Sequence, residues 1–165
     1  VTFLKYDPSA IVALVAGFAF GPGTGVVVSV LPYLVHLATQ SGVYGALMAI
    51  IATLTLVLPA SLVYQRDTSL KGAIIGMLVS SVAVSILFIF VNAFVMFPLY
   101  SNLYGMPLEA IIGMGTAINP RITNMTTMML YSVFPFNLFK HLVTSLITFL
   151  VYKRAGSALR KILYN

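Results

Sequence analysis

Charged residues are scarce in this sequence, and cysteine is absent. Charged residues make up 7% of the 165 positions, hydrophobic residues make up 60%, and the mean hydropathy is +1.04. A soluble globular domain carries about 25% charged residues, so the composition predicts an integral membrane protein. The lack of cysteine excludes disulfides and thiolate metal sites, and two histidines with three acids leave few ligands for any other metal.

Catalytic motifs are also missing. The sequence has no nucleophile paired with a base, no paired carboxylates, no HExxH zinc motif and no phosphate-binding glycine loop, so it predicts no enzyme and no catalytic cofactor. His36 and His141 have no acid near them in sequence, which leaves no proton relay. The formal net charge of +6 does not indicate nucleic acid, because the nine basic residues lie at segment ends and form no patch interleaved with aromatics.

Three apolar runs are long enough to cross a bilayer core of about 30 Å, which takes roughly 20 helical residues. They cover residues 43–64, 70–97 and 135–153. Pro98 is expected to end the second run, and Pro135 is expected to begin the third at a first-turn position. The sequence therefore predicts three membrane-spanning helices with these bounds.

The N-terminal apolar region is interrupted by Gly21-Pro22-Gly23. A proline flanked by glycines favours a break, so two shorter helices are expected, over residues 9–20 and 22–39. Small residues recur at every fourth position through the region: Ala13, Gly17, Gly21, Gly25 and Ser29. This spacing lets membrane helices approach closely, although glycine and alanine are also common in membrane helices in general.

Basic residues indicate the orientation, because cytoplasmic loops carry an excess of lysine and arginine. Arg66 and Lys71 follow the first clear span, and four more cations lie between residues 153 and 161. Both groups are expected in the cytoplasm, together with the C-terminus of a multi-pass protein of the cell membrane. On this count the chain begins outside, which predicts a leading helix that this sequence lacks: five membrane helices of a six-helix protein.

Residues 98–134 then face outward. This segment is too apolar for a solvated linker and too interrupted by glycine and proline for another span. Short helices that form a lid over the outer mouth of a single membrane domain, residues 1–165, are expected. A peripheral interfacial helix without a gating role is the alternative.

A polar face runs along the last predicted helix. Asn137, Lys140 and Thr144 follow one another at helical spacing, together with His141 and Thr148. A lone lysine near a helix start can snorkel to the membrane surface. Snorkelling gives no reason for Asn137 and Thr144 to share the face of Lys140, so a common role is favoured.

The helix predicted over 70–97 carries a matching stripe that reaches Asn92 near its outer end. An amide inside a membrane must find partners, so Asn92 and Asn137 mark either an interhelical hydrogen bond or a ligand site. Lys140 lies beside Asn137, and aromatic residues such as Tyr100 and Phe94 are available as a lining. A pocket for a polar, planar organic ligand is favoured.

Five stretches carry a family resemblance. They are FLKYDPSAIVALVAGFAFGPGTG (3–25), YGALMAIIATLTLVLPASLVYQR (44–66), LKGAIIGMLV (70–79), VNAFVMFPLY (91–100) and PFNLFKHLVTSLITFLVYKR (135–154). In this order they resemble the riboflavin-specific substrate-binding subunits, or S components, of energy-coupling-factor transporters. The similarity runs over most of the chain.

The resemblance implies an all-α, six-helix membrane bundle that binds a vitamin, here riboflavin as the transported ligand, near its outer face. Such subunits have no ATPase of their own and dock onto a membrane scaffold subunit with two ATP-binding cassette ATPases. In the family, the asparagine and lysine of a Pro-Phe-Asn-x-x-Lys motif contact the flavin, and here these are Asn137 and Lys140. Asn92, before Phe-Pro-Leu-Tyr, is implied as a third contact.

The chain departs from the family pattern at three places. Members often carry an acid at the position of Ala10, a Lys-Asn pair near Pro32-Tyr33 and an asparagine at Ala49. The losses leave open an S component for a different vitamin or flavin-like compound. Two other classes also stay open: a small membrane enzyme that acts on a lipid through Lys140 and His141, and a structural membrane subunit without a ligand.

Overall fold

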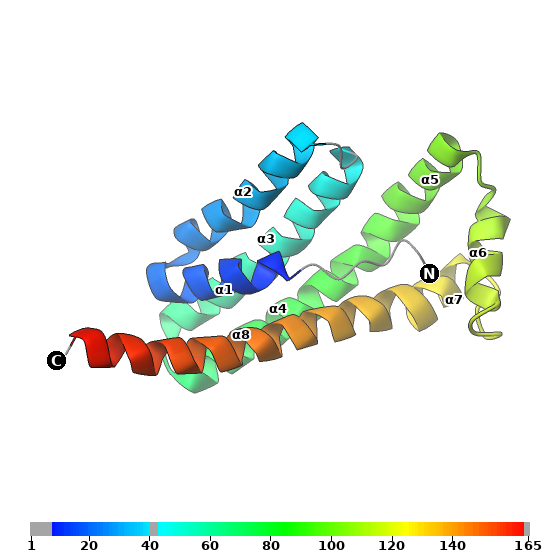
Figure 1. Cartoon of the computed structure of the whole chain (residues 1–165). Helices are drawn as coiled ribbons and strands as arrows, with labels where there is room; N and C mark the ends of the chain where they lie inside the picture. The colour runs from blue at the N-terminus through cyan, green and yellow to red at the C-terminus, as the bar shows by residue number, and fades with distance from the viewer. Residues whose placement is uncertain (1–7, 40–42, 164–165) are drawn as a thin grey trace. The chain divides into compact units, whose positions relative to one another are not determined.

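The computed structural model describes residues 8–39 and 43–163, in which helix is the only regular structure, as predicted (Figure 1). The chain divides into two compact units. The larger unit comprises Asp7–Ser81 and His141–Asn165, and the smaller unit is built around Val82–Lys140. Helices α4 (Leu70–Val91) and α8 (Phe134–Leu163) contribute residues to both units. A single domain over residues 1–165 stays a prediction.

The first two helices of the larger unit have the predicted bounds. α1 covers Ser9–Phe20 and α2 covers Pro22–Thr39. Gly21 separates them with a φ of 94°, a left-handed conformation that a residue without Cβ adopts at little cost. Pro22 occupies the first position of α2, where its missing N–H is not needed. The predicted break is confirmed.

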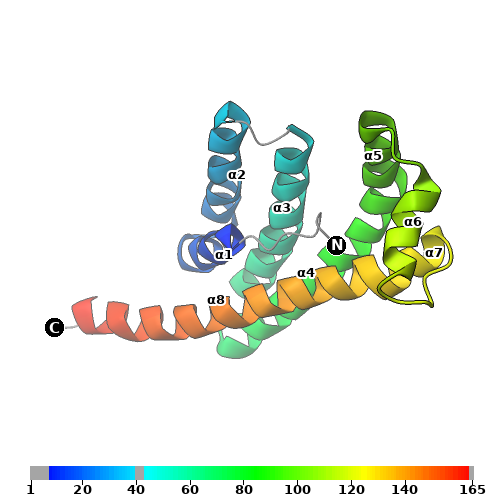
Figure 2. The same ribbon diagram turned by 45° about the vertical axis from the view of Figure 1, so that its right-hand side comes forward.

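Helices α1, α2 and α3 (Val43–Arg66) pack against one another, and α2 and α3 lie side by side (Figure 2). The packing depends on small residues. A Cβ atom on Gly25 would lie 2.9 Å from the Cα of Gly17 and 2.8 Å from Cγ1 of Val57, and one on Gly17 would collide with Oγ of Ser61. The predicted close approach is confirmed for Gly17 and Gly25.

Within the larger unit, α3, α4 and α8 are joined by buried and half-buried side chains. Oγ of Ser81 on α4 lies 3.1 Å from Oγ of Ser145 on α8, as a hydrogen bond. The hydroxyls of Tyr64 on α3 and Tyr152 on α8 are 2.5 Å apart, and both rings pack against Phe18 of α1 at centroid distances of 4.8 and 5.7 Å. These contacts connect residues far apart in sequence.

The helix that follows the α3–α4 turn does not end at Pro98. α4 passes into a π-helical segment, η1 (Asn92–Met96), and continues as α5 (Phe97–Tyr104). The N–H of Phe97 bonds the carbonyl of Asn92, five residues back. A proline ring clashes with the carbonyl four residues earlier in an α-helix, and the wider turn avoids that clash. The predicted end at Pro98 is wrong for this reason.

The last long helix likewise begins before Pro135. α7 (Met125–Met128) leads into a second π-helical segment, η2 (Met129–Val133), and then into α8. The N–H of Phe134 bonds the carbonyl of Met129, again five residues back. Asn124 caps α7 by accepting a hydrogen bond from the N–H of Thr127 at 2.9 Å. The predicted start at Pro135 is wrong by this extra helical stretch.

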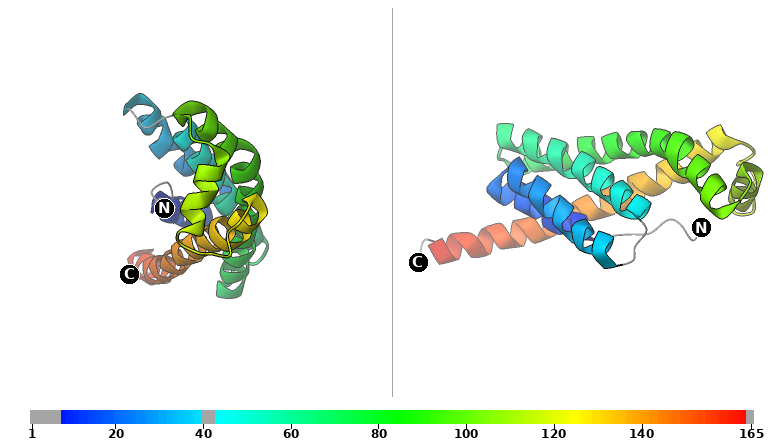
Figure 3. Two further views of the ribbon diagram at one scale, coloured as in Figure 1. Left: turned by 90° about the vertical axis from the view of Figure 1, so that its right-hand side faces the viewer. Right: turned by 90° about the horizontal axis from the view of Figure 1, so that it is seen from above.

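The remaining helix of the smaller unit is α6 (Leu108–Thr116), which contacts both α5 and α7 (Figure 3). Its buried face includes Ile111 and Gly115, and a Cβ on Gly115 would lie 2.6 Å from Sδ of Met128. A short helix in the segment 98–134 was expected and is present. Its role as a lid stays a prediction.

Three helices in the described part of the chain are long and apolar enough to cross a membrane, by length and composition. They are Val43–Arg66, Leu70–Asn102 and Met125–Arg154, and two shorter apolar helices cover Ser9–Phe20 and Pro22–Leu34. The three predicted spans are therefore confirmed as elements, while the second and third are longer than predicted.

Candidate functional site

The two π-helical segments of the smaller unit, η1 and η2, contact each other. Each is five residues long, and each is followed by a Phe-Pro pair, at residues 97–98 and 134–135. Single π-helical turns are rare in proteins and occur frequently at functional sites. The contact between η1 and η2 therefore marks the region of this unit in which a site is most expected.

Asn92 and Asn137 are each anchored to one of these segments. Asn92 is the first residue of η1, and its Nδ2 donates to the carbonyl oxygen of Phe88 at 2.8 Å. Nδ2 of Asn137 donates to the carbonyl oxygen of Val133, the last residue of η2, at 2.9 Å. Each bond uses one N–H, so the second N–H and Oδ1 of each amide take no part in it. The two predicted amides thus lie on elements that touch.

Lys140 and Tyr100 lie on the helices that continue from these segments. Lys140 is half-buried and comes one turn after Asn137 on α8, while Tyr100 is half-buried on α5. The side chain of Asn137 is only 6% exposed. A lysine ammonium supplies donors alone, whereas an amide both donates and accepts. The smaller unit therefore contains four of the five predicted site residues.

Thr144, the fifth predicted residue, belongs to the larger unit. It is buried, and its carbonyl oxygen accepts a hydrogen bond from Oγ1 of Thr148 at 2.8 Å. Together with Ser145, which bonds Ser81, it forms part of a buried polar face of α8 in that unit. The part of Thr144 in a ligand site stays a prediction.

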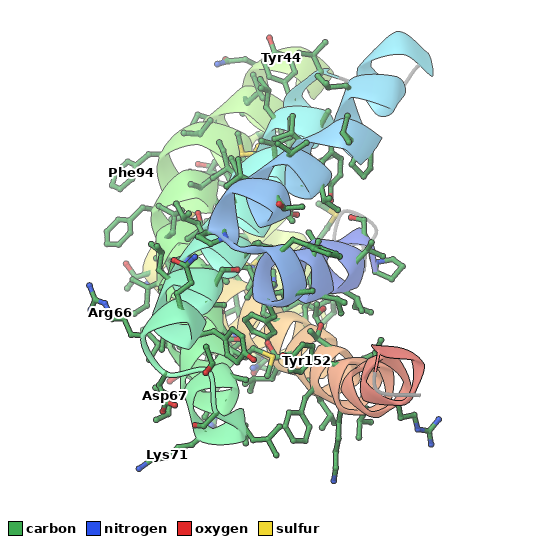
Figure 4. The ribbon with its side chains drawn as sticks, turned by 90° about the vertical axis from the view of Figure 1, so that its left-hand side faces the viewer. Tyr44, Arg66, Asp67, Lys71, Phe94 and Tyr152 are labelled. Carbon is green, nitrogen blue, oxygen red and sulfur yellow. The ribbon has the colours of Figure 1, made fainter. Side chains whose placement is uncertain are left out.

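Phe94 does not fit the expected aromatic lining. Its side chain is 76% exposed and projects away from the ribbon (Figure 4). The expectation is wrong for Phe94, because its position in η1 turns it outward. His141 is buried at 3% exposure, and the side chain of His36 lies outside the described residues.

Sequence reasoning missed a buried hydroxyl network in the larger unit. The hydroxyl of Tyr33, which is 4% exposed, lies 2.8 Å from Oγ of Ser9 and 3.3 Å from Oγ1 of Thr53. The network connects α1, α2 and α3. It includes Tyr33 and the neighbour of Ala10, and the chain departs from the family pattern at both of these places. A tyrosine in an otherwise apolar run was the available signal.

Neither unit contains a constellation for metal chemistry within the residues that the structure describes: no group of three histidine or acid side chains lies together there. The features that stand out are helices of membrane-spanning length, two contacting π-helical segments and two anchored amides. They define an all-helical membrane protein in which two amide side chains are hydrogen-bonded to helix carbonyl groups. The family model described as "ECF transporter, substrate-specific component" matches residues 1–152, and the chain belongs to this family, which is one of transporter components and not of enzymes.

Two curated relatives align with most of the chain. The riboflavin transporter RibU of Staphylococcus aureus (strain TCH60) is 26% identical over 161 residues, which cover 97% of this chain and 79% of the relative. The riboflavin transporter FmnP of Bacillus subtilis (strain 168) is 24% identical over 154 residues, covering 91% and 75%.

A solved structure described by its title as the S component of a bacterial ECF transporter has the same fold. It aligns with a TM-score of 0.74 at 25% identity, over 97% of this chain and 84% of that chain. The fold that the sequence resemblance implied is confirmed.

Proposed function

We propose that this chain is the vitamin-binding subunit of an energy-coupling-factor importer and that its vitamin is riboflavin. Membership of the substrate-specific component family supports the role, and two relatives named riboflavin transporters support the ligand. In this role the chain works with a membrane scaffold subunit and two ATP-binding cassette ATPases. Its C-terminus faces the cytoplasm, which the cations after the last span support.

The pair of anchored amides on η1 and η2 carries the site assignment. Riboflavin has carbonyl and N–H groups on one ring edge and hydroxyls on its ribityl chain, so its binding site needs both donors and acceptors. Asn92 and Asn137 supply both, and Lys140 supplies donors. Tyr100 offers an aromatic face to the flat ring system, and Thr144 offers a hydroxyl to the ribityl chain.

The ligand assignment is tested on the purified protein. We expect it to carry the visible absorbance and fluorescence of a flavin, and native mass spectrometry to identify riboflavin. A different vitamin in the bound state would overturn the ligand and keep the role. Folded protein that binds no vitamin at all would overturn the role as well.

Site substitutions give the first quantitative prediction. Asn137→Ala and Lys140→Ala are each expected to weaken riboflavin binding about 10- to 100-fold, because a hydrogen bond that involves a charged or desolvated group contributes about 1.5–3 kcal/mol. Quenching of flavin fluorescence on titration measures the affinity. Asn102→Ala, an exposed amide at the end of α5, is the matched control and should bind as the wild type does. Wild-type affinity in both site variants would show that these residues do not form the site.

A further inference from the structure

One end of the larger unit carries aromatic side chains followed, toward the helix termini, by exposed cations. The aromatic group consists of Phe18, Tyr64 and Tyr152, which contact one another, and of Phe20, which is 78% exposed. The cationic end, as we name it, consists of Arg66, Lys71, Lys153 and Arg154, all of them exposed.

Two side-chain contacts show that these cations share one end of the unit. Ser145 of α8 bonds Ser81, well inside α4, and Tyr152 bonds Tyr64, close to the end of α3. Because α3 and α4 are joined by a short turn at residues 67–69, α8 runs from the middle of this unit toward that turn. The C-terminal part of α8 and the α3–α4 turn therefore lie toward the same end of the larger unit.

The cations of α3 and α8 follow closely after the two tyrosines that join these helices. Arg66 is two residues beyond Tyr64, and Lys153 and Arg154 are one and two residues beyond Tyr152. At about 1.5 Å per residue, Arg66 lies about 3 Å beyond Tyr64 along α3, and Lys153 and Arg154 lie about 1.5 and 3 Å beyond Tyr152 along α8. Lys71 lies in the first turn of α4, across the turn from Arg66, and both side chains point outward (Figure 4).

Four basic residues and one acid lie at this end. Asp67 is the only carboxylate among residues 64–71 and 152–154, and its Oδ1 accepts the backbone N–H of Ser69 at 3.0 Å within the turn. Hydrogen bonds from Ser69, with a smaller effect of Lys71, hold the pKa of Asp67 below its ordinary value of 3.8. The carboxylate stays ionised and engaged in the turn at neutral pH, and the formal charges of these residues sum to a positive excess.

The apolar surface next to the cations indicates what they meet. Leu62, Leu70 and Leu150 are 45%, 51% and 52% exposed, and each lies a few residues from the cationic end on a helix that belongs to a span or leads out of one. Exposed leucines on a span face lipid tails, and lysine or arginine beyond them reach the headgroups. We infer that the cationic end is a binding site for anionic phospholipid headgroups, with cations supplied by the α3–α4 turn and by the end of α8.

The test compares lipids of different headgroup charge on the purified full chain. Native mass spectrometry and thermal unfolding in micelles are expected to show preferential retention of phosphatidylglycerol over phosphatidylcholine, and a larger rise in melting temperature with the former. Each cation removed should lower the preference roughly fivefold, which corresponds to about 1 kcal/mol per charge near an anionic membrane surface. The preference should also fall when the salt is raised from about 0.1 to about 0.5 M, because the Debye length then shortens to well below 10 Å.

The variants separate the two halves of the site. Arg66→Gln with Lys71→Gln removes the turn half, and Lys153→Gln with Arg154→Gln removes the α8 half, so each pair should lose part of the preference and retain the fold by circular dichroism. Arg121→Gln, an exposed cation of the smaller unit, is the matched control and should keep the full preference.

Three results would overturn the inference. One is equal retention of the two lipids by the wild type. Another is an equal melting shift with inorganic phosphate alone, which would indicate a free anion instead of a lipid. The third is an unchanged lipid preference in both double variants. If these variants also failed to assemble with the energy-coupling module, the surface would serve a protein partner instead of a lipid.

Discussion

At the scale of single residues, Gly72 in the first turn of α4 has the least room of the glycines that the structure describes. Oγ of Ser69 accepts the N–H of Gly72 at 3.2 Å, and a Cβ on Gly72 would collide with the backbone carbonyl of Asp67. The obstacle is backbone, so it cannot move aside as the end of a flexible side chain would. The α3–α4 turn therefore requires glycine here for lack of space and not for its conformational freedom.

Gly72→Ala is accordingly expected to destabilise the protein by about 1–3 kcal/mol, as overpacking does in well-packed regions. Thermal unfolding in detergent measures the change. Gly113→Ala on α6 is the control, because a Cβ there meets nothing within 4 Å, and alanine should stabilise the helix by up to about 1 kcal/mol. Equal melting temperatures for Gly72→Ala and the wild type would show that the turn relaxes freely.

The hydroxyl of Tyr33 is a second residue-scale feature, since it serves Ser9 and Thr53 at once. Tyr33→Phe keeps the ring and removes this partner from the buried Thr53 and the half-buried Ser9, so a loss of about 1–2 kcal/mol is expected. Chemical or thermal unfolding should show it. Tyr44→Phe, at a side chain that is 47% exposed, should be neutral, and a comparable loss in both variants would argue against the network.

At the scale of elements, proline explains both what sequence reasoning captured and what it missed. Gly21-Pro22 was a sound boundary, since glycine can cap a helix with positive φ and proline can begin one. Pro98 and Pro135 look the same locally, yet the helices continue through them. A helix interrupted inside a bilayer would expose unpaired N–H and C=O groups, so the chain widens one turn instead. The rule that proline ends a helix is drawn from soluble proteins, and it does not include the cost of unpaired backbone groups inside a bilayer.

A deletion tests whether the widened turn accommodates Pro98. Removing Val95, a half-exposed residue of η1, should convert the segment to α-helix and keep the register of α5, but it places Pro98 in an unbroken helix at a cost of about 3 kcal/mol. Combining the deletion with Pro98→Ala should restore most of the stability. Circular dichroism melts of the wild type, the deletion, Pro98→Ala and the combination give the coupling energy between the two changes. Additive effects of the two changes would indicate that η1 has another cause.

At the scale of the whole molecule, composition and family pattern predicted the class, the fold and the three long helices. The positions of Asn92 and Asn137 on touching elements were expected from their similar depth, and the contact of η1 with η2 supports it. The Tyr64–Tyr152 and Ser81–Ser145 bonds could not be predicted. Their partners are 88 and 64 residues apart, and no local pattern relates two hydroxyls on separate helices.

The proposed function has a consequence for the stability of the full chain. Riboflavin at a hundred times its dissociation constant is expected to stabilise the folded protein by about 2.7 kcal/mol, since it binds the folded state alone. A melting series with riboflavin and with other vitamins at equal concentration measures this. A melting temperature indifferent to every vitamin would be the behaviour of a structural subunit.

The turn at Gly21 changes the meaning of the small-residue repeat around it. In one straight helix, glycine at every fourth position would offer a smooth ridge to a neighbouring protein. Here the chain reverses at Gly21, so Gly17 and Gly25 face each other, and the second half of the repeat packs against the first. Bulky substitutions at these two positions should therefore disturb the folding of a single chain before they disturb any assembly.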